Sequence, residues 1–191
     1  MNNYLLLLAI SLLFTLCSYY KESQEPIFKI KKGQHNYTLI LFYRYLHYLV
    51  YAYFALLPLT VNVKKPNQDI DIYIICTFSL IFTWMFLDIC FLALSELNHY
   101  KIKNIYNIDT SFHPGLFILF KEYSYIVNLF LGLLFFINIS RIIYYYPFSS
   151  TQLKVMFALF IYLGIVKCLI NKKIKKKYER SYINDFIMNT F

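Results

Sequence analysis

Long runs of apolar residues, separated by short polar segments, are the main pattern along this chain. Within each run the apolar residues are continuous rather than alternating, which favours helices over β-strands. A helix needs about 20 apolar residues to cross the hydrocarbon core of a bilayer, and it satisfies its own backbone hydrogen bonds there. The pattern therefore predicts transmembrane helices at about 4–20, 37–60, 70–94, 123–144 and 153–170.

The segments between these runs complete the predicted architecture. Residues 116–120 follow a His-Pro-Gly turn and precede Lys121 and Glu122, so we expect them to lie at the membrane interface. No linker rich in Gly, Ser or Pro divides the sequence, so 1–191 is predicted to be a single membrane domain. The predicted fold is an all-α integral membrane bundle of about five transmembrane helices, with a basic, amphipathic tail at 171–191 ending in a short interfacial helix.

The composition supports the same class of protein. The chain is 59% hydrophobic and 15% charged, whereas roughly a quarter of the residues in an average globular chain are charged. Lipid is therefore expected to cover the apolar surface that a soluble domain of this length could not bury. The four cysteines stand singly in apolar runs, as small buried hydrophobic residues do, which argues against zinc and thioredoxin-like sites.

The charge of the chain predicts its orientation. Lys and Arg number 19 against 10 Asp and Glu, which gives a net charge of +9. With five crossings and the C-terminus inside, 13 basic residues fall on the inner side and four on the outer side. The positive-inside rule then predicts that the N-terminus lies outside and the C-terminus on the cytoplasmic or inner side. The excess of positive charge indicates contact with lipid headgroups rather than with nucleic acid.

The first apolar segment is interpreted as a retained helix and not as a signal peptide. No basic region precedes it, and Leu16-Cys17-Ser18 is a poor cleavage site. Cleavage would also put the Lys-rich segment that follows on the outer side, against the charge bias.

Charged residues within the predicted helices are the candidates for function. Arg44 lies about seven residues into the second helix, roughly 10 Å deep at 1.5 Å per residue, and Asp88 lies about six residues before the end of the third. The two residues are thus expected at similar depth, where an unpaired charge costs about 2.5–3.5 kcal/mol. We therefore predict an ion pair between Arg44 and Asp88.

Two polar stripes extend this pair into a candidate site of Arg44, His47, Asp88 and Glu96. His47 shares a helical face with Arg44, and Glu96 shares one with Asp88. One interpretation is a structural clamp, in which Glu96 lies at the interface and Arg44 reaches the inner headgroups. The other is a proton or ion relay, or a site for a small polar ligand.

Other chemistry has little support in the sequence. His99 and His113 are fourteen residues apart, without the short His spacings of a metal site on a helix. A Gly-rich phosphate loop and a serine nucleophile elbow are also missing. We predict no metal, no cofactor and no enzyme activity.

The tail is strongly basic. Each basic residue near an anionic leaflet contributes about 1 kcal/mol of attraction, so the tail is expected to bind anionic headgroups. Tyr182, Ile183, Phe186 and Ile187 recur at helical spacing, as in an interfacial helix; the alternative is a topology signal followed by a frayed end. The residues expected to contact headgroups are Lys172, Lys173, Lys175, Lys176, Lys177 and Arg180.

The second and third predicted helices carry a further motif, whose residues are Leu46, His47, Tyr48, Pro58, Trp84, Asp88, Cys90, Leu92 and Glu96. It resembles uncharacterised multi-pass membrane proteins of nucleocytoplasmic large DNA viruses, in which a Trp after His leads to Cys-x-Leu-Thr-x-x-Glu. Thr83 replaces that His here, and Ala93 replaces the Thr. The resemblance covers about a quarter of the chain and implies an integral protein of a viral or host-derived membrane.

These observations predict a multi-pass membrane protein with a structural or assembly role in a viral membrane. Its expected partners are the bilayer, anionic headgroups, and other membrane proteins or a second copy of the chain. Two alternatives stay open. One is a subunit of a mitochondrially encoded complex in the inner membrane. The many Tyr, Phe, Ile, Asn and Lys residues, which AT-rich codons encode, also fit this alternative. The other is a small transporter or channel that uses Arg44, His47 and Asp88.

Overall fold

The computed structural model describes residues 3–24, 36–87, 90–100, 113–148 and 150–175, and all regular secondary structure in these ranges is helical. The predicted all-α class is therefore confirmed for this part of the chain. The helices are α1 (Asn3–Ser23), α3 (Tyr37–Thr60), α4 (Gln68–Leu87), α5 (Phe91–His99), α6 (Pro114–Phe120), the 3-10 turn η3 (Lys121–Tyr123), α7 (Ser124–Tyr145) and α8 (Thr151–Lys175).

Three helical stretches are long and apolar enough to cross a membrane. They are Tyr4–Ser23, Tyr37–Thr60 and Pro114–Tyr145, the last of which runs through α6, η3 and α7. The length and composition of these stretches indicate a membrane protein, and among the described residues three stretches, not the predicted five, are long and apolar enough to span. In α8 the apolar part among those residues is the shorter stretch Leu153–Val166.

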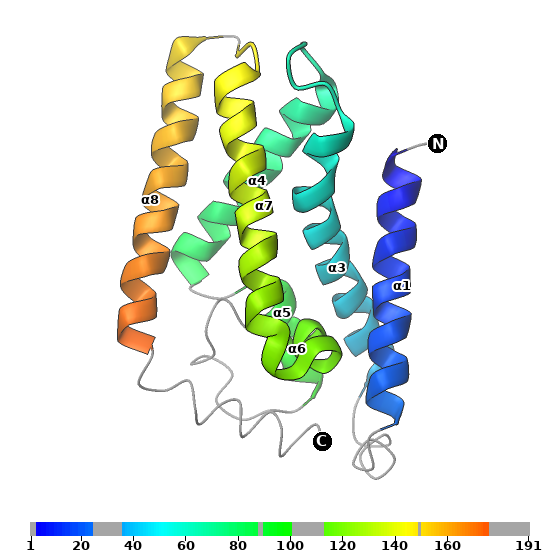
Figure 1. The fold of residues 1–191 in the computed structure, drawn as a ribbon. Coiled ribbons are helices and arrows are strands. Elements are labelled where there is room, and N and C mark those ends of the chain that lie inside the picture. The colour runs from blue at the N-terminus through cyan, green and yellow to red at the C-terminus, as the bar shows by residue number, and fades with distance from the viewer. Residues whose placement is uncertain (1–2, 25–35, 88–89, 101–112, 149, 176–191) are drawn as a thin grey trace.

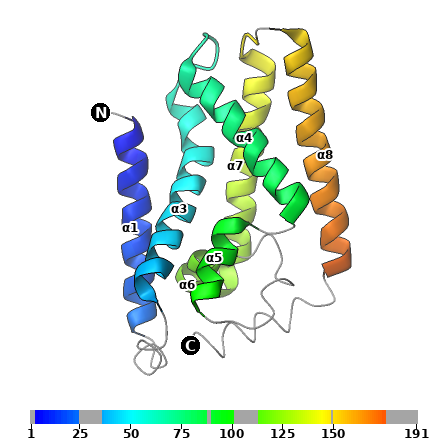
Figure 2. The ribbon, with the colours of Figure 1, turned by 180° about the vertical axis from the view of Figure 1, so that it is seen from behind.

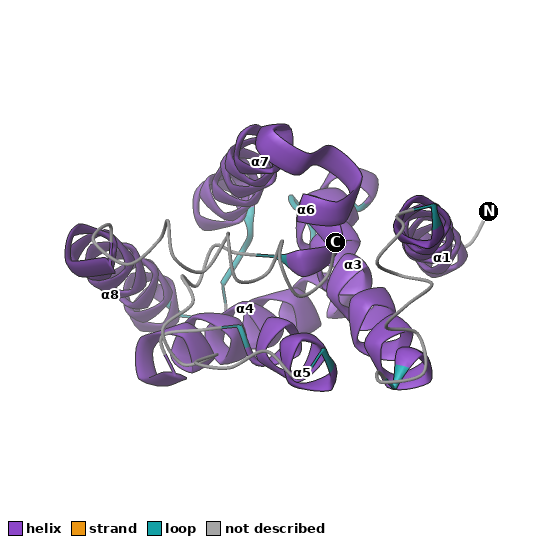
Figure 3. Ribbon diagram, turned by 90° about the horizontal axis from the view of Figure 1, so that it is seen from below, coloured by secondary structure: helices purple, strands orange, loops and turns teal. Residues whose placement is uncertain are grey.

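Helix α3 is the central element of the bundle. It contacts α1 on one side and α5 and α7 on others (Figure 1). Seen from below, α1 and α8 lie at opposite edges, and α8 contacts α4 (Figure 3). The Asn36 side chain accepts a hydrogen bond from the backbone N–H of Leu39 and so caps α3 at its first turn, which fixes where this helix begins.

The predicted single helix 70–94 is two helices. α4 ends at Leu87 and is inclined to its neighbours (Figure 2), whereas α5 begins at Phe91. Cys90 has extended backbone angles (φ −68°, ψ 120°) and is the N-cap of α5, so the helix cannot continue through it. The apolar pattern gives no sign of this break, because tertiary contacts of α5 with α3 outweigh local helix propensity there.

A similar turn separates α6 from α7. Lys121 has a positive φ of 48°, and the 3-10 turn Lys121–Tyr123 follows it. The expected boundary at Lys121 and Glu122 matches this turn. Pro114, Gly115, Leu116 and Ile118 of α6 are buried, however, so α6 is packed into the protein rather than lying on its surface.

A proline inside α3 accounts for polar contacts in the core. Pro58 has no N–H, so the carbonyl of Phe54 lacks the donor that an α-helix normally supplies. The Tyr73 hydroxyl of α4 donates to this carbonyl at 3.0 Å, and the Asn138 side-chain amide of α7 donates at 3.1 Å. Neighbouring helices thus satisfy the group that Pro58 leaves exposed, as hydrocarbon surroundings require.

We predict that the effect of Tyr73→Phe depends on Pro58. In the native chain the substitution removes a donor from the Phe54 carbonyl and should lower the free energy of unfolding by about 1 kcal/mol. With Pro58→Ala also present, the residue 58 N–H serves that carbonyl and the loss should be smaller. A double-mutant cycle by thermal unfolding in detergent measures the coupling. Tyr162→Phe, at an exposed position of α8, is the control, and equal losses in both backgrounds would contradict the interpretation.

Candidate functional site

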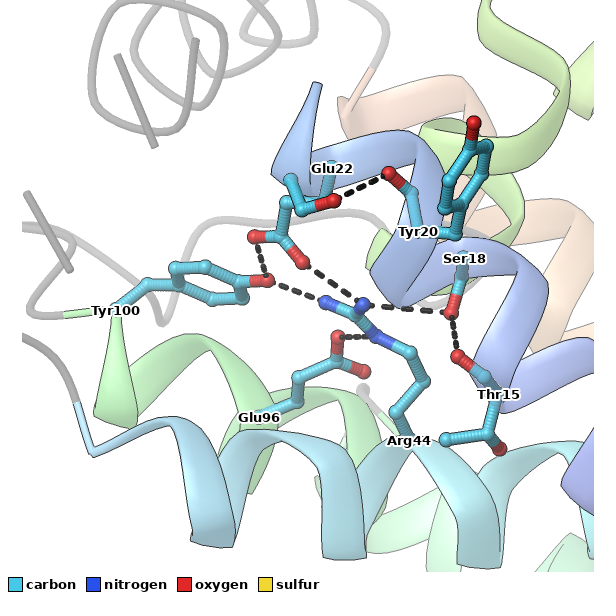
Figure 4. Close-up of polar contacts among 8 residues, drawn as sticks. Thr15, Ser18, Tyr20, Glu22, Arg44, Glu96 and Tyr100 are labelled. Carbon is cyan, nitrogen blue, oxygen red and sulfur yellow. Dashed lines mark hydrogen bonds and ion pairs between the residues drawn. The ribbon is translucent and has the colours of Figure 1, made fainter. Parts of the chain in front are cut away.

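Arg44 is the centre of a buried polar cluster. Its side chain is fully buried, and its guanidinium contacts two carboxylates (Figure 4). Arg44 Nε donates to Glu96 Oε1 at 2.8 Å, and Nη1 donates to Glu22 Oε2 at 2.9 Å. Nη1 also donates to Ser18 Oγ at 3.3 Å, and Nη2 donates to the Tyr100 hydroxyl. Among the described residues these are the two ion pairs of the protein, and Arg44 makes both.

Helix α1 supplies one side of the cluster through a stripe of small polar residues. Ser11, Thr15, Ser18 and Glu22 are all buried and recur at spacings of four, three and four, so they share one face of the helix. The three hydroxyls donate to carbonyls one turn earlier; Ser18 donates to the Thr15 carbonyl at 2.8 Å. Glu22 is thus the last and only charged member of the stripe, at the level of Arg44.

Residues of α5 and its C-cap supply the other side. Glu96 comes from α5, and Tyr100 is the residue that caps this helix. The Tyr100 hydroxyl donates to Glu22 Oε1 at 2.6 Å while it accepts from Arg44. The cluster therefore joins α1, α3 and α5. Glu22 lies 22 residues before Arg44 in the chain, and Tyr100 lies 56 residues after it.

The charges of the cluster do not balance when every group is ionised. One guanidinium faces two carboxylates, and Glu96 Oε2 has no hydrogen-bond partner among the described residues. Burial raises the pKa of Glu96 to about 7, and the attraction of Arg44 only partly offsets this. A proton on Glu96 would remove the excess negative charge, so the cluster is suited to hold one proton near neutral pH.

The structure brings together half of the predicted site. Arg44 and Glu96 are in contact, but Glu96 is fully buried rather than at the interface. Arg44 likewise points to Glu22 and Glu96 rather than to headgroups, because two carboxylates satisfy it inside the protein. Asp88, the predicted partner of Arg44, lies outside the described residues; the carboxylates found on Arg44 are Glu22 and Glu96.

Glu22, Ser18 and Tyr100 are not among the residues predicted for the site. The first helix was predicted to end at about residue 20, before Glu22, yet α1 continues to Ser23. The signal was present, since Ser11, Thr15, Ser18 and Glu22 form a helical stripe in an otherwise apolar segment. For Tyr100 the sequence offers no comparable signal.

His47 belongs to a second, uncharged polar group. Its ring stacks on Tyr51 (5.3 Å between centroids) and packs edge-on against His113 (4.3 Å). Cys90 Sγ lies 3.5 Å from His47 Nε2, and the Tyr51 hydroxyl donates to Asn128 Oδ1 at 3.3 Å. His113 is the N-cap of α6, and its Nδ1 is buried without a hydrogen-bond partner in the described residues.

The two polar groups are separated by very little space. A void of about 10 Å³ lies between them, and its walls include Arg44, Tyr48, Glu96 and His113. One water molecule needs roughly 10–15 Å³ and two to four polar partners. The void thus has room for about one water beside Glu96.

The headgroup contacts predicted for the basic tail stay a prediction. Lys172, Lys173 and Lys175 lie in the last turns of α8, where side chains are not described, and Lys176, Lys177 and Arg180 lie outside the described residues. Within the described ranges, no three His, Cys, Asp or Glu residues are close enough to hold a metal ion. Comparison with protein-family models, with curated proteins and with solved structures found no match to this chain.

We predict that Arg44→Met destabilises the protein strongly. Removing the guanidinium leaves Glu22 and Glu96 buried without their cation, and breaking a buried ion pair costs about 3–5 kcal/mol. Thermal unfolding in detergent micelles measures the loss. Arg141→Met is the matched control, because Arg141 makes a single 3.3 Å bond to the Pro58 carbonyl and should cost much less. Similar losses in the two variants would contradict a central role for Arg44.

We also predict a pH dependence carried by Glu96. The folded protein holds the pKa of Glu96 at about 7 against an ordinary value of 4.5. The folded state therefore binds more protons than the unfolded state between these values, so this stabilisation is fully present below about pH 4.5 and is lost as the pH rises through 7. From pH 5 to pH 8 the difference amounts to roughly 2 kcal/mol.

Glu96→Gln should flatten the dependence of the unfolding free energy on pH, because the amide does not titrate. Thermal unfolding of native and variant protein between pH 5 and pH 8 tests the idea, because the other titrating groups cancel in the difference. Glu122→Gln, an exposed carboxylate in η3, is the control and should leave the profile unchanged. Parallel profiles for native protein and Glu96→Gln would show that Glu96 does not carry the effect.

Proposed function

We propose that this chain is a multi-pass integral membrane protein with a structural or assembly role. The proposal rests on how the buried charges are paired. Arg44 donates hydrogen bonds to Glu22, Glu96 and Tyr100 of the same chain, and the space beside them fits about one water. Charges arranged in this way hold helices together, whereas a transport path needs groups that are open to solvent or to an ion.

The apolar surface supports an interaction role. Many large side chains on α1 and α7 are more than half exposed, among them Leu5, Leu13 and Leu16 on α1 and Ile126 and Phe130 on α7. Such surfaces are covered in a membrane by lipid or by other helices. The proposed partners are therefore the bilayer and other membrane proteins, or a second copy of the chain.

We further propose five crossings, in which α4 and α8 are added to the three apolar spans. The orientation would put the N-terminus outside and the C-terminus inside, following the distribution of basic residues. Lys21 and Lys121 lie at the end of the bundle that holds α5 and α6, and Lys64 and Lys65 lie in the α3–α4 connection at the opposite end (Figure 1). A basic tail after α8 would then face the anionic headgroups of the inner leaflet.

The identity of the membrane rests on the sequence alone. A viral or host-derived membrane follows from the resemblance of the second and third predicted helices, and the mitochondrial inner membrane is the alternative. Transport through an Arg44, His47 and Asp88 stripe has weaker support, because His47 packs with Tyr51 and His113 and is not among the bonded neighbours of Arg44.

Proton flux separates the structural role from the transport role. In proteoliposomes with an imposed pH gradient, the native protein should dissipate the gradient no faster than empty vesicles, and Glu96→Gln and His47→Ala should behave alike. In parallel, chemical crosslinking in native membranes should capture a second copy or another membrane protein. Gradient collapse that Glu96→Gln abolishes, or a chain that crosslinks to nothing, would count against the proposal.

A further inference from the structure

A cavity of about 330 Å³ lies between α3, α4, α7 and α8. Most of its wall is hydrocarbon, from residues such as Phe54, Ile81, Leu129, Phe135 and Ile161. The cavity is open at the surface of α7, because Leu129, Leu133 and Phe136 line it and are also exposed. In a membrane protein an apolar opening of this kind is accessible to lipid, and its volume falls at the small end of ligand pockets.

One end of the cavity is polar. His47, Tyr51, Cys90, His113 and Asn128 line it there, where α3, α7 and the N-caps of α5 and α6 meet. This is the end of the bundle at which α5 and α6 lie (Figure 1). The cavity is therefore amphipathic, with a short polar end near one membrane face and an apolar part directed toward the middle of the bundle.

Among the described residues, no Asp, Glu, Lys or Arg side chain lines the cavity, and the nearby cation, Arg44, is already paired with Glu22 and Glu96. Burying an ionised head without a partner costs several kcal/mol. A neutral head avoids that cost, so an anionic or cationic ligand fits this site poorly.

His113 indicates what the neutral head should be. Its Nδ1 is buried and lacks a hydrogen-bond partner in the described residues, and an unpaired buried polar atom is destabilising. Whether Nδ1 donates or accepts depends on the tautomer of the ring. A hydroxyl both donates and accepts, so it satisfies either tautomer.

We propose that this cavity binds one lipid from the bilayer that has a hydroxyl head and a single apolar chain or ring system. The hydroxyl lies against His113 and its uncharged neighbours, and the apolar part fills the space between α3, α7 and α8. The proposal is independent of the structural role above, because it concerns a surface that the Arg44 cluster does not use.

Gly132 of α7 provides the means to test the site. It lines the cavity, and a Cβ added there would meet no atom within 4 Å. Gly132→Leu should therefore fill ligand space without disturbing packing, and it replaces a poor helix former by a good one. Its four side-chain carbons displace a similar number of ligand carbons, each of which contributes about fourfold to affinity, so binding should weaken by roughly a hundredfold.

The probe is hexadecanol carrying a photoreactive diazirine, used on the full chain in phosphatidylcholine nanodiscs. Labelled peptides identified by mass spectrometry should map to α3 and α7 around the cavity, and unlabelled hexadecanol should compete. At probe concentrations below saturation, Gly132→Leu should reduce labelling by at least about tenfold. Phe130→Leu, on the exposed face of the same helix, should not. Labelling that does not saturate, or that Gly132→Leu leaves unchanged, would mean contact with surrounding lipid and would overturn the site.

Head chemistry is tested with three probes of equal chain length, namely the diazirine forms of hexadecanol, hexadecanoate and hexadecane. The native protein should prefer the alcohol, and His113→Phe should erase the preference over hexadecane. A preference for hexadecanoate, or one that persists in His113→Phe, would overturn the hydroxyl assignment.

Cys90 gives a second measurement that does not depend on Gly132→Leu. It is buried and lines the polar end. With Cys17, Cys76 and Cys168 replaced by Ser, unlabelled hexadecanol should slow the reaction of Cys90 with a small maleimide. Unchanged reactivity at saturating hexadecanol would contradict occupancy at this end.

Discussion

The burial of one guanidinium is the constraint on which the arrangement of the helices depends. Arg44 lies within the N-terminal third of α3, an apolar helix, and its charge and its N–H groups must be satisfied inside the protein. No single neighbouring helix provides enough acceptors. Glu22 reaches it from α1, and Glu96 and Tyr100 reach it from α5 and its C-cap. The position of α1 and the break before α5 both follow from this requirement.

The same rule operates at the other end of α3. Pro58 leaves the Phe54 carbonyl without its helical donor, and Tyr73 and Asn138 supply donors from α4 and α7. A polar group in α3 thus holds α1 and α5 at one end, and another holds α4 and α7 toward the other. Apolar packing alone discriminates weakly between helix arrangements in lipid, because lipid tails are as apolar as the side chains. Specific polar contacts from α3 therefore account for its central position.

The sequence predicted helices well where the pattern was local and less well where it was not. The bounds 37–60 match α3, because a continuous apolar run with an Asn before it and a Pro near its end is a local signal. The break at Cys90 was missed, because it depends on the contact between Glu96 and Arg44, 52 residues away. Pairing of Arg44 with a carboxylate was predictable, because an unpaired buried charge is costly. The helical stripe that ends at Glu22 was a local signal for one partner, whereas the sequence offers no comparable signal for Tyr100.

Helix α6 packs where the charged cluster around Arg44 comes close to the uncharged polar group around His47. A Cβ on Gly115 would lie 2.7 Å from the Tyr48 hydroxyl oxygen and 3.2 Å from Arg44 Cγ, so α6 packs closely against α3 here and a larger residue would require the Tyr48 side chain to shift. That approach leaves about 10 Å³ between Glu96 and His113. The charged groups of Arg44, Glu22 and Glu96 thus lie on one side of this small void, and the amphipathic cavity lies on the other side, beyond His47. The packing of this short helix therefore allows the ion-paired cluster of Arg44 and the proposed site for a neutral ligand to lie next to each other in one small bundle.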